Sequence, residues 1–208
     1  EQLNLDPRLL RGIFSYGFER PSPIQSKAIK PLIEGKDLIA QAQSGTGKTG
    51  AFAIGAIQKV DFKDDTTQVL ILSPTRELST QSAKVVSSIG AFIPELSVKT
   101  FFGGSSMENS ISVPHIICGC PGRVYDMMKR EKILCEKIKL IIFDEADEML
   151  SSGFKDQVYN IFQYLNNDVQ VGLFSATLPE SINPIIEKIT RNPCKIEVKR
   201  QQLTLEGI

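Results

Sequence analysis

The sequence predicts an α/β protein with a mostly parallel central sheet and helices on both of its faces. Apolar runs without polar alternation, such as 69–72 and 139–143, are typical of strands that are buried on both faces. Segments with helical spacing of apolar residues alternate with these runs, which is the order that parallel strands and crossover helices produce. A small-residue loop ends in Gly47-Lys48-Thr49 between an apolar strand and an apolar helix, which is the context of a phosphate-binding loop.

Composition limits the class of protein. The chain has 208 residues, of which 41% are hydrophobic and 23% charged, so it can bury a sizeable core. The formal net charge is zero, so any nucleic acid must be held by a local patch. No apolar run is long enough to span a bilayer, the N-terminus lacks a signal-peptide pattern, and four cysteines do not indicate a disulfide scaffold. We therefore expect one domain in a reducing, intracellular compartment, without a membrane partner.

Capping residues mark the two N-terminal helices. Each begins with an N-cap followed by proline at the first helical position, at Asp6-Pro7 and at Ser22-Pro23. Glycines end them, at Gly17 and Gly35. Pro31 is expected to kink or end the second helix, because proline cannot donate the helical hydrogen bond.

The rest of the chain alternates strand and helix. Apolar runs predict strands at 37–40, 69–72, 97–102, 116–118, 139–143, 169–174 and 196–198. Helical spacing predicts helices at 50–60, 76–89, 124–129, 158–165 and 182–189, with a polar loop at 61–67 and a linker or tail at 203–208.

Polar segments recur where the predicted strands end. They are the phosphate loop, Pro74-Thr75-Arg76, Gly103-Gly104, Pro121-Gly122-Arg123, Asp144-Glu145 and Ser175-Ala176-Thr177. The carboxyl ends of parallel strands share one edge of a sheet, and ligands bind at that edge. We expect these segments to converge there.

The phosphate loop and the acidic pair predict nucleotide hydrolysis. Lys48 can reach the β- and γ-phosphates, and the Thr49 hydroxyl can ligate Mg²⁺. Asp144 follows an apolar strand in the Walker-B arrangement, and Glu145 is a candidate base for the attacking water. The strict loop pattern has glycine where this chain has Ala42, so an ordinary glycine-rich turn remains the alternative to a phosphate loop. For Asp144 and Glu145, the alternative is that they are solvated acidic caps of the next helix.

Several polar side chains allow two interpretations. Gln25 can complete a capping box with Ser22, or it can match the donor–acceptor edge of adenine while Phe18 stacks on the base. Arg76 and Arg123 each lie in a strand-to-helix turn and suit the phosphates of a nucleic-acid strand, but ordinary ion pairing is equally compatible with their positions.

One cluster of potential metal ligands occurs in the sequence. His115, Cys118 and Cys120 lie close together in the sequence. Buried cysteine in a strand usually behaves as a small hydrophobe, and a fourth ligand is not evident, so the sequence favours the structural interpretation.

Taken in order, these segments resemble the motifs of the DEAD-box RNA helicases. Gly17-Phe18 with Pro21 and Ile24-Gln25 resembles the Q motif, which covers about 14–25. The other matches are Ala42–Thr49 for motif I, Pro74–Leu78 for Ia, Gly103-Gly104 for the glycine doublet, Pro121–Arg123 for Ib, Asp144–Asp147 for II and Ser175–Thr177 for III. The resemblance covers nearly the whole chain and explains alanine at position 42.

The resemblance implies a RecA-like domain and a set of roles. It implies an N-terminal RecA-like ATP-binding domain at 1–200 and the start of an interdomain linker at 201–208, with the family's second RecA-like domain absent. ATP and Mg²⁺ are the implied cofactors. By resemblance, ATP is bound by Phe18, Gln25, Ala42, Gln43, Ser44, Gly45, Thr46, Gly47, Lys48 and Thr49, and the catalytic residues are Lys48, Asp144 and Glu145. Thr49 and Asp144 hold Mg²⁺, partly through water, while Asp147, Ser175 and Thr177 couple nucleotide state to RNA. Thr75, Arg76, Gly104, Gly122 and Arg123 contact the RNA backbone.

Within the family, the stretches at 40–49, 147–155 and 203–208 most resemble helicases of translation initiation, with an RNA clamp of the exon-junction type as the alternative. The expected partners are RNA and initiation-factor scaffold proteins, for a monomer in the cytoplasm, or in the nucleus for the alternative. A P-loop kinase or GTPase, or a DNA helicase, are the more distant alternatives. The chain by itself is expected to bind nucleotide weakly and to unwind nothing.

Two departures from the family pattern bear on RNA binding. Motif Ib usually opens with threonine, and here the residue is Cys120, whose thiol is a weak hydrogen-bond donor to phosphate. The segment 105–113 is shorter than usual, so we expect a helix there to be reduced.

Overall fold

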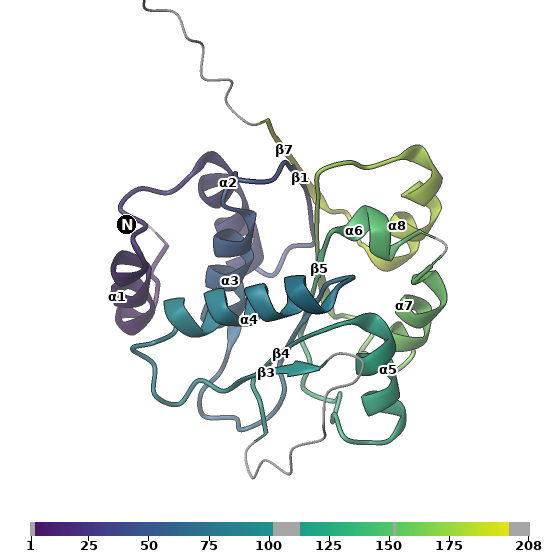
Figure 1. Ribbon diagram of the computed structural model, residues 1–208, viewed down its shortest axis with the longest axis horizontal. Coiled ribbons are helices and arrows are strands. Elements are labelled where there is room, and N and C mark those ends of the chain that lie inside the picture. The colour runs from purple at the N-terminus through teal and green to yellow at the C-terminus, as the bar shows by residue number, and fades with distance from the viewer. Residues whose placement is uncertain (1–2, 102–112, 152, 200–208) are drawn as a thin grey trace, which may run out of the picture.

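A parallel sheet of seven strands forms the centre of the computed structural model, which describes residues 3–101, 113–151 and 153–199 (Figure 1). The strand order is β3-β4-β2-β5-β6-β1-β7, and every neighbouring pair is parallel. The strands are β1 (Leu38–Ala42), β2 (Val69–Leu72), β3 (Val98–Phe101), β4 (Ile116–Gly119), β5 (Leu140–Asp144), β6 (Gln170–Ser175) and β7 (Cys194–Val198). The predicted α/β class is confirmed, and the sheet in the described residues is entirely parallel.

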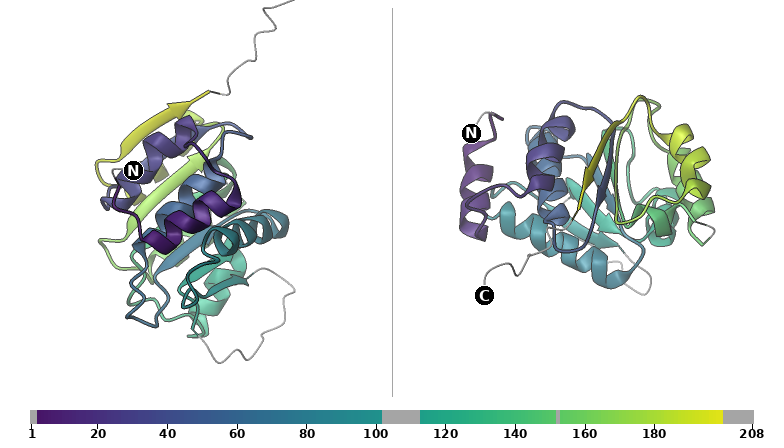
Figure 2. Two further views of the ribbon diagram at one scale, coloured as in Figure 1. Left: turned by 90° about the vertical axis from the view of Figure 1, so that its left-hand side faces the viewer. Right: turned by 90° about the horizontal axis from the view of Figure 1, so that it is seen from above.

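Helices cover both faces of the sheet (Figure 2). One face carries α1 (Pro7–Tyr16), α2 (Pro23–Ile33), α3 (Lys48–Lys59) and α4 (Arg76–Ile89), and the other carries α5 (Pro121–Lys129), α6 (Ala146–Met149), α7 (Lys155–Phe162) and α8 (Asn183–Ile189), the last preceded by a 3₁₀ turn at Glu180–Ile182. No helix in the described part of the chain is long and apolar enough to cross a membrane.

The continuous apolar runs serve two cores at once. In β5, Leu140 and Ile142 pack into the core under α1–α4, whereas Ile141 and Phe143 pack into the core under α5–α8. Successive side chains of a strand point to opposite faces, so a strand covered on both sides must be apolar at every position. This requirement explains why the strand pattern in the sequence lacks polar alternation.

Helix boundaries differ from the predictions in ways that matter for the site. The helix after β1 begins at Lys48, two residues before the predicted start, so Lys48 and Thr49 lie in its first turn. The helix after β4 begins at Pro121 rather than 124, because proline is well suited to the first helical position. Pro31 lies in the last turn of α2, which continues to Ile33, and Gly35 follows with a φ of 82°.

Candidate nucleotide and nucleic-acid site

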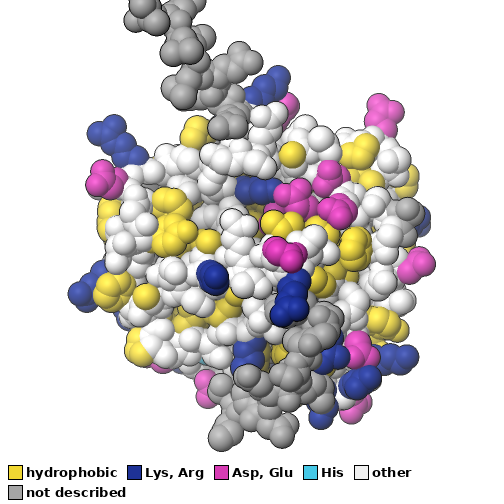
Figure 3. Space-filling view, viewed as in Figure 1, with side chains coloured by type: hydrophobic (Ala, Val, Ile, Leu, Met, Phe, Trp, Pro, Cys, Tyr) yellow, Lys and Arg dark blue, Asp and Glu magenta, His cyan; other side chains and the backbone are white. Residues whose placement is uncertain are grey.

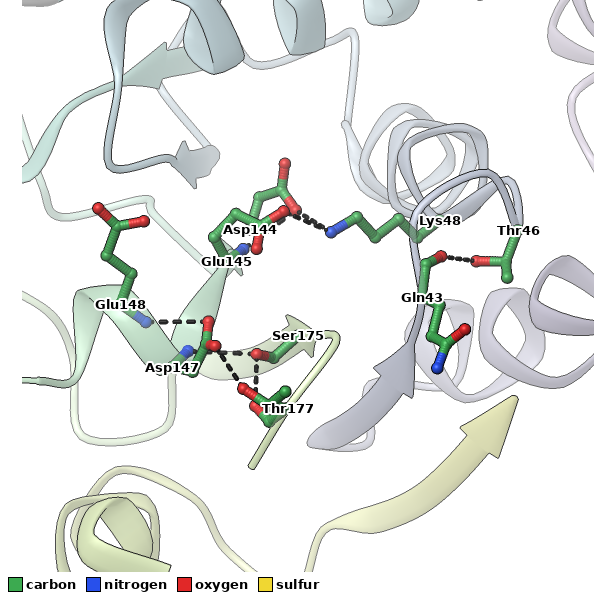
Figure 4. A network of polar contacts seen from close by, with 9 residues as sticks. All are labelled: Gln43, Thr46, Lys48, Asp144, Glu145, Asp147, Glu148, Ser175 and Thr177. Carbon is green, nitrogen blue, oxygen red and sulfur yellow. Dashed lines mark hydrogen bonds and ion pairs between the residues drawn. The ribbon is translucent and has the colours of Figure 1, made fainter. Parts of the chain in front are cut away.

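The loop after β1 leaves a helix N-terminus open toward the cavity. Gly45 and Gly47 have φ values of 81° and 87°, a conformation that glycine adopts without strain. The Thr46 hydroxyl donates to the Gln43 carbonyl oxygen at 2.6 Å and closes the loop (Figure 4). No side chain of the described residues caps α3, so its first N–H groups and its positive dipole end remain available for an anion.

Ala42 has a structural explanation. It is the last residue of β1, it is fully buried, and it pairs with Val198 of β7. The backbone at this position is an ordinary strand, so the glycine of the strict phosphate-loop pattern is not required for conformation here.

Lys48 bridges the loop to the acidic pair at the end of β5 (Figure 4). Its Nζ lies 3.2 Å from Asp144 Oδ1 and 2.8 Å from Glu145 Oε1. The Lys48 and Asp144 side chains are buried, whereas Glu145 is partly exposed. Glu145 has a φ of 55°, unusual for a residue with a side chain, and its N–H donates to Asp144 Oδ1 at 3.1 Å. Functional sites are where such backbone conformations concentrate.

Burial and charge act against each other at this ion pair. Burial alone would lower the pKa of Lys48, but the Asp144 charge and the hydrogen bond to Glu145 outweigh it and raise the pKa above its ordinary value. Burial raises the pKa of Asp144, and the Lys48 charge opposes that rise. Lys48 is therefore held in its protonated form, whereas for Asp144 burial outweighs the Lys48 charge and the net effect is a raised pKa.

A cavity of about 340 Å³ joins these residues. It is lined by Tyr16, Phe18, Ser44, Gly45, Gly47, Lys48, Thr49, Gly50, Leu78, Gln81, Val85, Asp144 and Glu145. The structure thus brings most of the predicted nucleotide-binding residues together. Ala42, Gln43, Thr46 and Gln25 do not line the cavity. In the space-filling view, acidic side chains gather near the middle of one face with a basic side chain beside them (Figure 3).

Gln25 does have its structural role, and it also contacts the phosphate loop. The side-chain Oε1 of Gln25 accepts from the backbone N–H of Ser22 at 3.0 Å. The backbone N–H of Gln25 donates to Ser22 Oγ at 3.4 Å, which completes the capping box. Its Nε2 donates to the Gly47 carbonyl oxygen at 3.4 Å. Gln25 is 3% exposed, and its amide lies under the loop, at the side of α3 on which Phe18 packs.

The three predicted coupling residues form one hydrogen-bonded group (Figure 4). The Thr177 hydroxyl donates to Asp147 Oδ2 at 2.6 Å, and Ser175 Oγ accepts from the Asp147 N–H at 3.3 Å. Ser175 also donates to the Thr177 carbonyl oxygen at 2.6 Å. Burial would raise the pKa of Asp147, but these hydrogen bonds outweigh it and lower the pKa. The turn after β6 is thereby joined to the helix that follows Asp144 and Glu145.

The predicted RNA-binding residues lie at two adjacent helix N-termini. Thr75 caps α4, with its Oγ accepting from the Leu78 N–H at 3.2 Å, and Arg76 next to it is exposed. Gly122 is exposed in the first turn of α5, where a side chain would meet open space. Arg123 forms an ion pair with Asp126 at 3.1 Å. Gly104 and residues 105–112 lie outside the described residues.

Cys120 connects these two helix starts. It is the N-cap residue of α5 and makes no capping hydrogen bond, and its Sγ lies 3.7 Å from Ser79 Oγ in the first turn of α4. Burial raises the pKa of this thiol. The thiol therefore packs between the helices instead of presenting a hydroxyl to a phosphate.

The cysteines and histidine that prompted the metal hypothesis have separate surroundings. Cys118 is fully buried in β4, and burial raises its pKa to about 12. His115 Nδ1 accepts from the Ser97 N–H at 3.1 Å, and its ring meets Phe62 edge to face. Among the described residues, no group of three or more His, Cys, Asp or Glu side chains is arranged to hold a metal.

The sequence reasoning missed some residues of the site. Tyr16 borders the cavity from the end of α1, and Gln41 in β1 donates through Nε2 to the Ala176 carbonyl oxygen at 3.3 Å. Leu78, Gln81 and Val85 enter from α4. The sequence Tyr16-Gly17-Phe18 could have predicted the position of Tyr16, because a glycine at the end of a helix turns the chain so that the residues before and after it lie close together. Packing of α4 against the cavity had no such local signal.

Fold and site together define an α/β nucleotide-binding protein with a phosphate loop. A family model described as DEAD/DEAH box helicase matches residues 22–185. This chain belongs to the DEAD/DEAH box helicase family. It is 50% identical over its whole length to the ATP-dependent RNA helicase eIF4A of Scheffersomyces stipitis and 49% identical to the probable eukaryotic initiation factor 4A of Trypanosoma brucei brucei. The chain spans 53% of the length of each of these relatives.

Solved structures agree with the fold. Dbp5 of S. cerevisiae bound to RNA and ADP BeF3 superposes with a TM-score of 0.89 at 36% identity, over 95% of this chain and 51% of that one. A DEAD box protein from Methanococcus jannaschii gives a TM-score of 0.88 at 35% identity, over 95% and 55%. The RecA-like fold expected from the motifs is confirmed.

Proposed function

We propose that this chain is the ATP-binding part of an ATP-dependent RNA helicase that remodels mRNA during translation initiation. The observation that carries the proposal is the meeting of Lys48, Asp144 and Glu145 in one cavity, with Phe18 at its wall. Similarity to relatives named initiation factor 4A supports the biological process. In this assignment Lys48 binds phosphate, Phe18 and Gln25 recognise adenine once the Gln25 amide leaves the Gly47 carbonyl oxygen, and Glu145 orients the attacking water.

The cavity has side chains that fit Mg²⁺. Thr49 and Asp144 both line it and both present oxygen atoms, the ligand type that Mg²⁺ takes while it keeps several waters. When bound, the ion neutralises charge on the phosphates. The raised pKa of Lys48 keeps a second positive charge beside the same phosphates.

The RNA backbone is assigned to the adjacent N-termini of α4 and α5. Exposed Thr75, Arg76 and Gly122 offer hydroxyl, guanidinium and backbone N–H groups to phosphate oxygens. Such contacts hold a strand without reading its sequence. From the resemblance of the sequence motifs, we further propose a monomer in the cytoplasm that works with an initiation scaffold protein.

Nucleotide preference tests the proposal on this chain directly. We expect calorimetry to show weak Mg²⁺-dependent binding of ADP and weaker binding of GDP. Gln25→Glu keeps an oxygen for the Ser22 N–H but removes the amide donor, so the preference for ADP should fall while the helix stays capped. Gln25→Ala should lose the preference and some stability.

Gln163→Ala is the matched control, because Gln163 is exposed at the end of α7 on the other face of the sheet. It should bind both nucleotides as the wild type does. Equal binding of ADP and GDP by the wild type, unchanged by Gln25→Glu, would refute adenine recognition by Gln25.

A further inference from the structure

Tyr16 borders the nucleotide cavity, and although it lies within the stretch that resembles the Q motif, no role has been assigned to it above. It is the last residue of α1, and its side chain is 42% exposed. It lines the same cavity as Lys48 and Glu145. A large aromatic side chain that is half open to solvent beside a ligand cavity is well placed to become covered when the ligand binds.

The turn after α1 fixes Tyr16 against Phe18. Gly17 has a φ of 106°, and its N–H points back to the carbonyl oxygens of Ile13 and Phe14. The Phe18 N–H also donates to the Ile13 oxygen, at 3.2 Å. The turn returns the chain so that the two ring centroids lie 4.9 Å apart with planes inclined by 57°. The two rings therefore form one aromatic wall whose shape is set by the backbone.

The aromatic wall packs on the first turn of α3, and apolar side chains of α4 line the same cavity. A Cβ on Gly50 would lie 2.8 Å from the Phe18 ring, so glycine at this position lets the ring rest on the first turn of α3. Leu78 and Val85 of α4 line the same cavity. The cavity thus combines a charged part that suits phosphates with an apolar part that suits a planar base.

We propose that Tyr16 is a second aromatic contact for the nucleotide base, beside Phe18, and that it adds affinity without choosing among bases. The inference rests on the proposed nucleotide site. Every base has a π face that an aromatic ring can cover, so stacking tolerates a change of base. Choice among bases needs hydrogen bonds to the base edge, which a ring face does not make.

The test compares three variants with three ligands by calorimetry on the 208-residue chain in Mg²⁺. Tyr16→Ala should bind ADP and GDP about fivefold to tenfold more weakly, the lower part of the range for base stacking on an aromatic ring. It should bind pyrophosphate as the wild type does, and its preference for ADP over GDP should be unchanged. Tyr16→Phe should retain ADP affinity, because it keeps the ring.

Phe14→Ala is the matched control. Phe14 is on the same helix and 55% exposed, and it does not line the described cavity, so its loss should leave all three affinities unchanged. Unaltered ADP binding by Tyr16→Ala would overturn the inference, and so would equal weakening of ADP and pyrophosphate, which would indicate a structural role. A wild-type chain that binds none of the ligands would overturn the proposed function, and the inference with it.

Discussion

At the scale of single residues, burial and nearby charges shift the pKa of His115 in opposite directions. It is the one histidine in the sequence and is 3% exposed. Burial lowers its pKa below the ordinary 6.5, although the nearby charges of Asp65 and Asp64 act in the opposite direction. The neutral ring is therefore the form that the folded protein accepts, with Nδ1 accepting from the Ser97 N–H.

The sign of the pH effect follows from this direction. Below pH of about 6.5 the unfolded chain binds a proton at His115 more readily than the folded chain does. Stability contributed by this residue is complete above that pH and is lost as the pH falls through the lower, folded pKa. We expect a lower urea midpoint at pH 5.5 than at pH 7.5 for the wild type.

His115→Gln isolates the residue, because glutamine does not titrate. The variant can be less stable at both pH values, but the difference between its two midpoints should shrink. Other groups, including Asp144 with its raised pKa, contribute equally to both proteins. An identical pH difference in variant and wild type would show that His115 does not carry the effect.

At the scale of elements, the turn after β6 depends on one hydroxyl. Ser175 is fully buried, accepts from the Asp147 N–H and donates to the Thr177 carbonyl oxygen. Ser175→Ala leaves both groups without this partner, and such losses cost about 1–3 kcal/mol. We expect urea unfolding to show a loss of stability in that range.

Ser73→Ala is the matched control for this prediction. Ser73 is also fully buried at the end of a strand, but its Oγ has no hydrogen-bond partner among the described residues. Its replacement should be close to neutral, because no hydrogen bond is lost. Equal destabilisation by both substitutions would mean that the Ser175 hydrogen bonds contribute little.

Elements also show what the sequence can and cannot predict. The strands were predictable because burial on both faces demands apolar residues at every position, as in β5. Helix starts were less predictable: α3 begins at Lys48 directly after Gly47, whose positive φ makes it the N-cap, and apolar spacing does not reveal this. The Lys48–Glu145 contact joins residues 97 positions apart, and only the motif context suggested it. The approach of α4 to the cavity is a packing result with no local pattern.

At the scale of the whole molecule, strand order sorts the functional segments along one edge. The two helices assigned to RNA follow β4 and β2, while the nucleotide residues follow β5 and β1. The strand β6 lies between β5 and β1, and its turn bonds to Asp147 after β5. The hydrogen-bonded turn therefore lies within the nucleotide segments, and β5 separates it from the pair of strands that precede the RNA segments. This order gives a physical route by which the two ligands can affect each other.

The positive charge available in the cavity bears on the rate of hydrolysis. Lys48 is the only cation among the described residues that line the cavity, and its Nζ is engaged by Asp144 and Glu145. An arginine that meets the transferring phosphate contributes about 10³–10⁵ in rate in related phosphoryl-transfer enzymes. We therefore expect the 208 residues on their own to hydrolyse ATP slowly, with no stimulation by single-stranded RNA, in a phosphate-release assay.

A protein that carries these 208 residues in a chain as long as the relatives, which are about twice as long as this one, is the decisive comparison. It should show RNA-stimulated turnover, and Glu145→Gln in that protein should abolish the turnover while ADP binding persists, since glutamine keeps the volume but loses the base. The Glu145 carboxylate is bound to Lys48 at 2.8 Å here, so ATP must first draw Lys48 to its phosphates before Glu145 can orient a water. Strong RNA-stimulated hydrolysis by the 208 residues alone would show that this rearrangement needs no group from outside them.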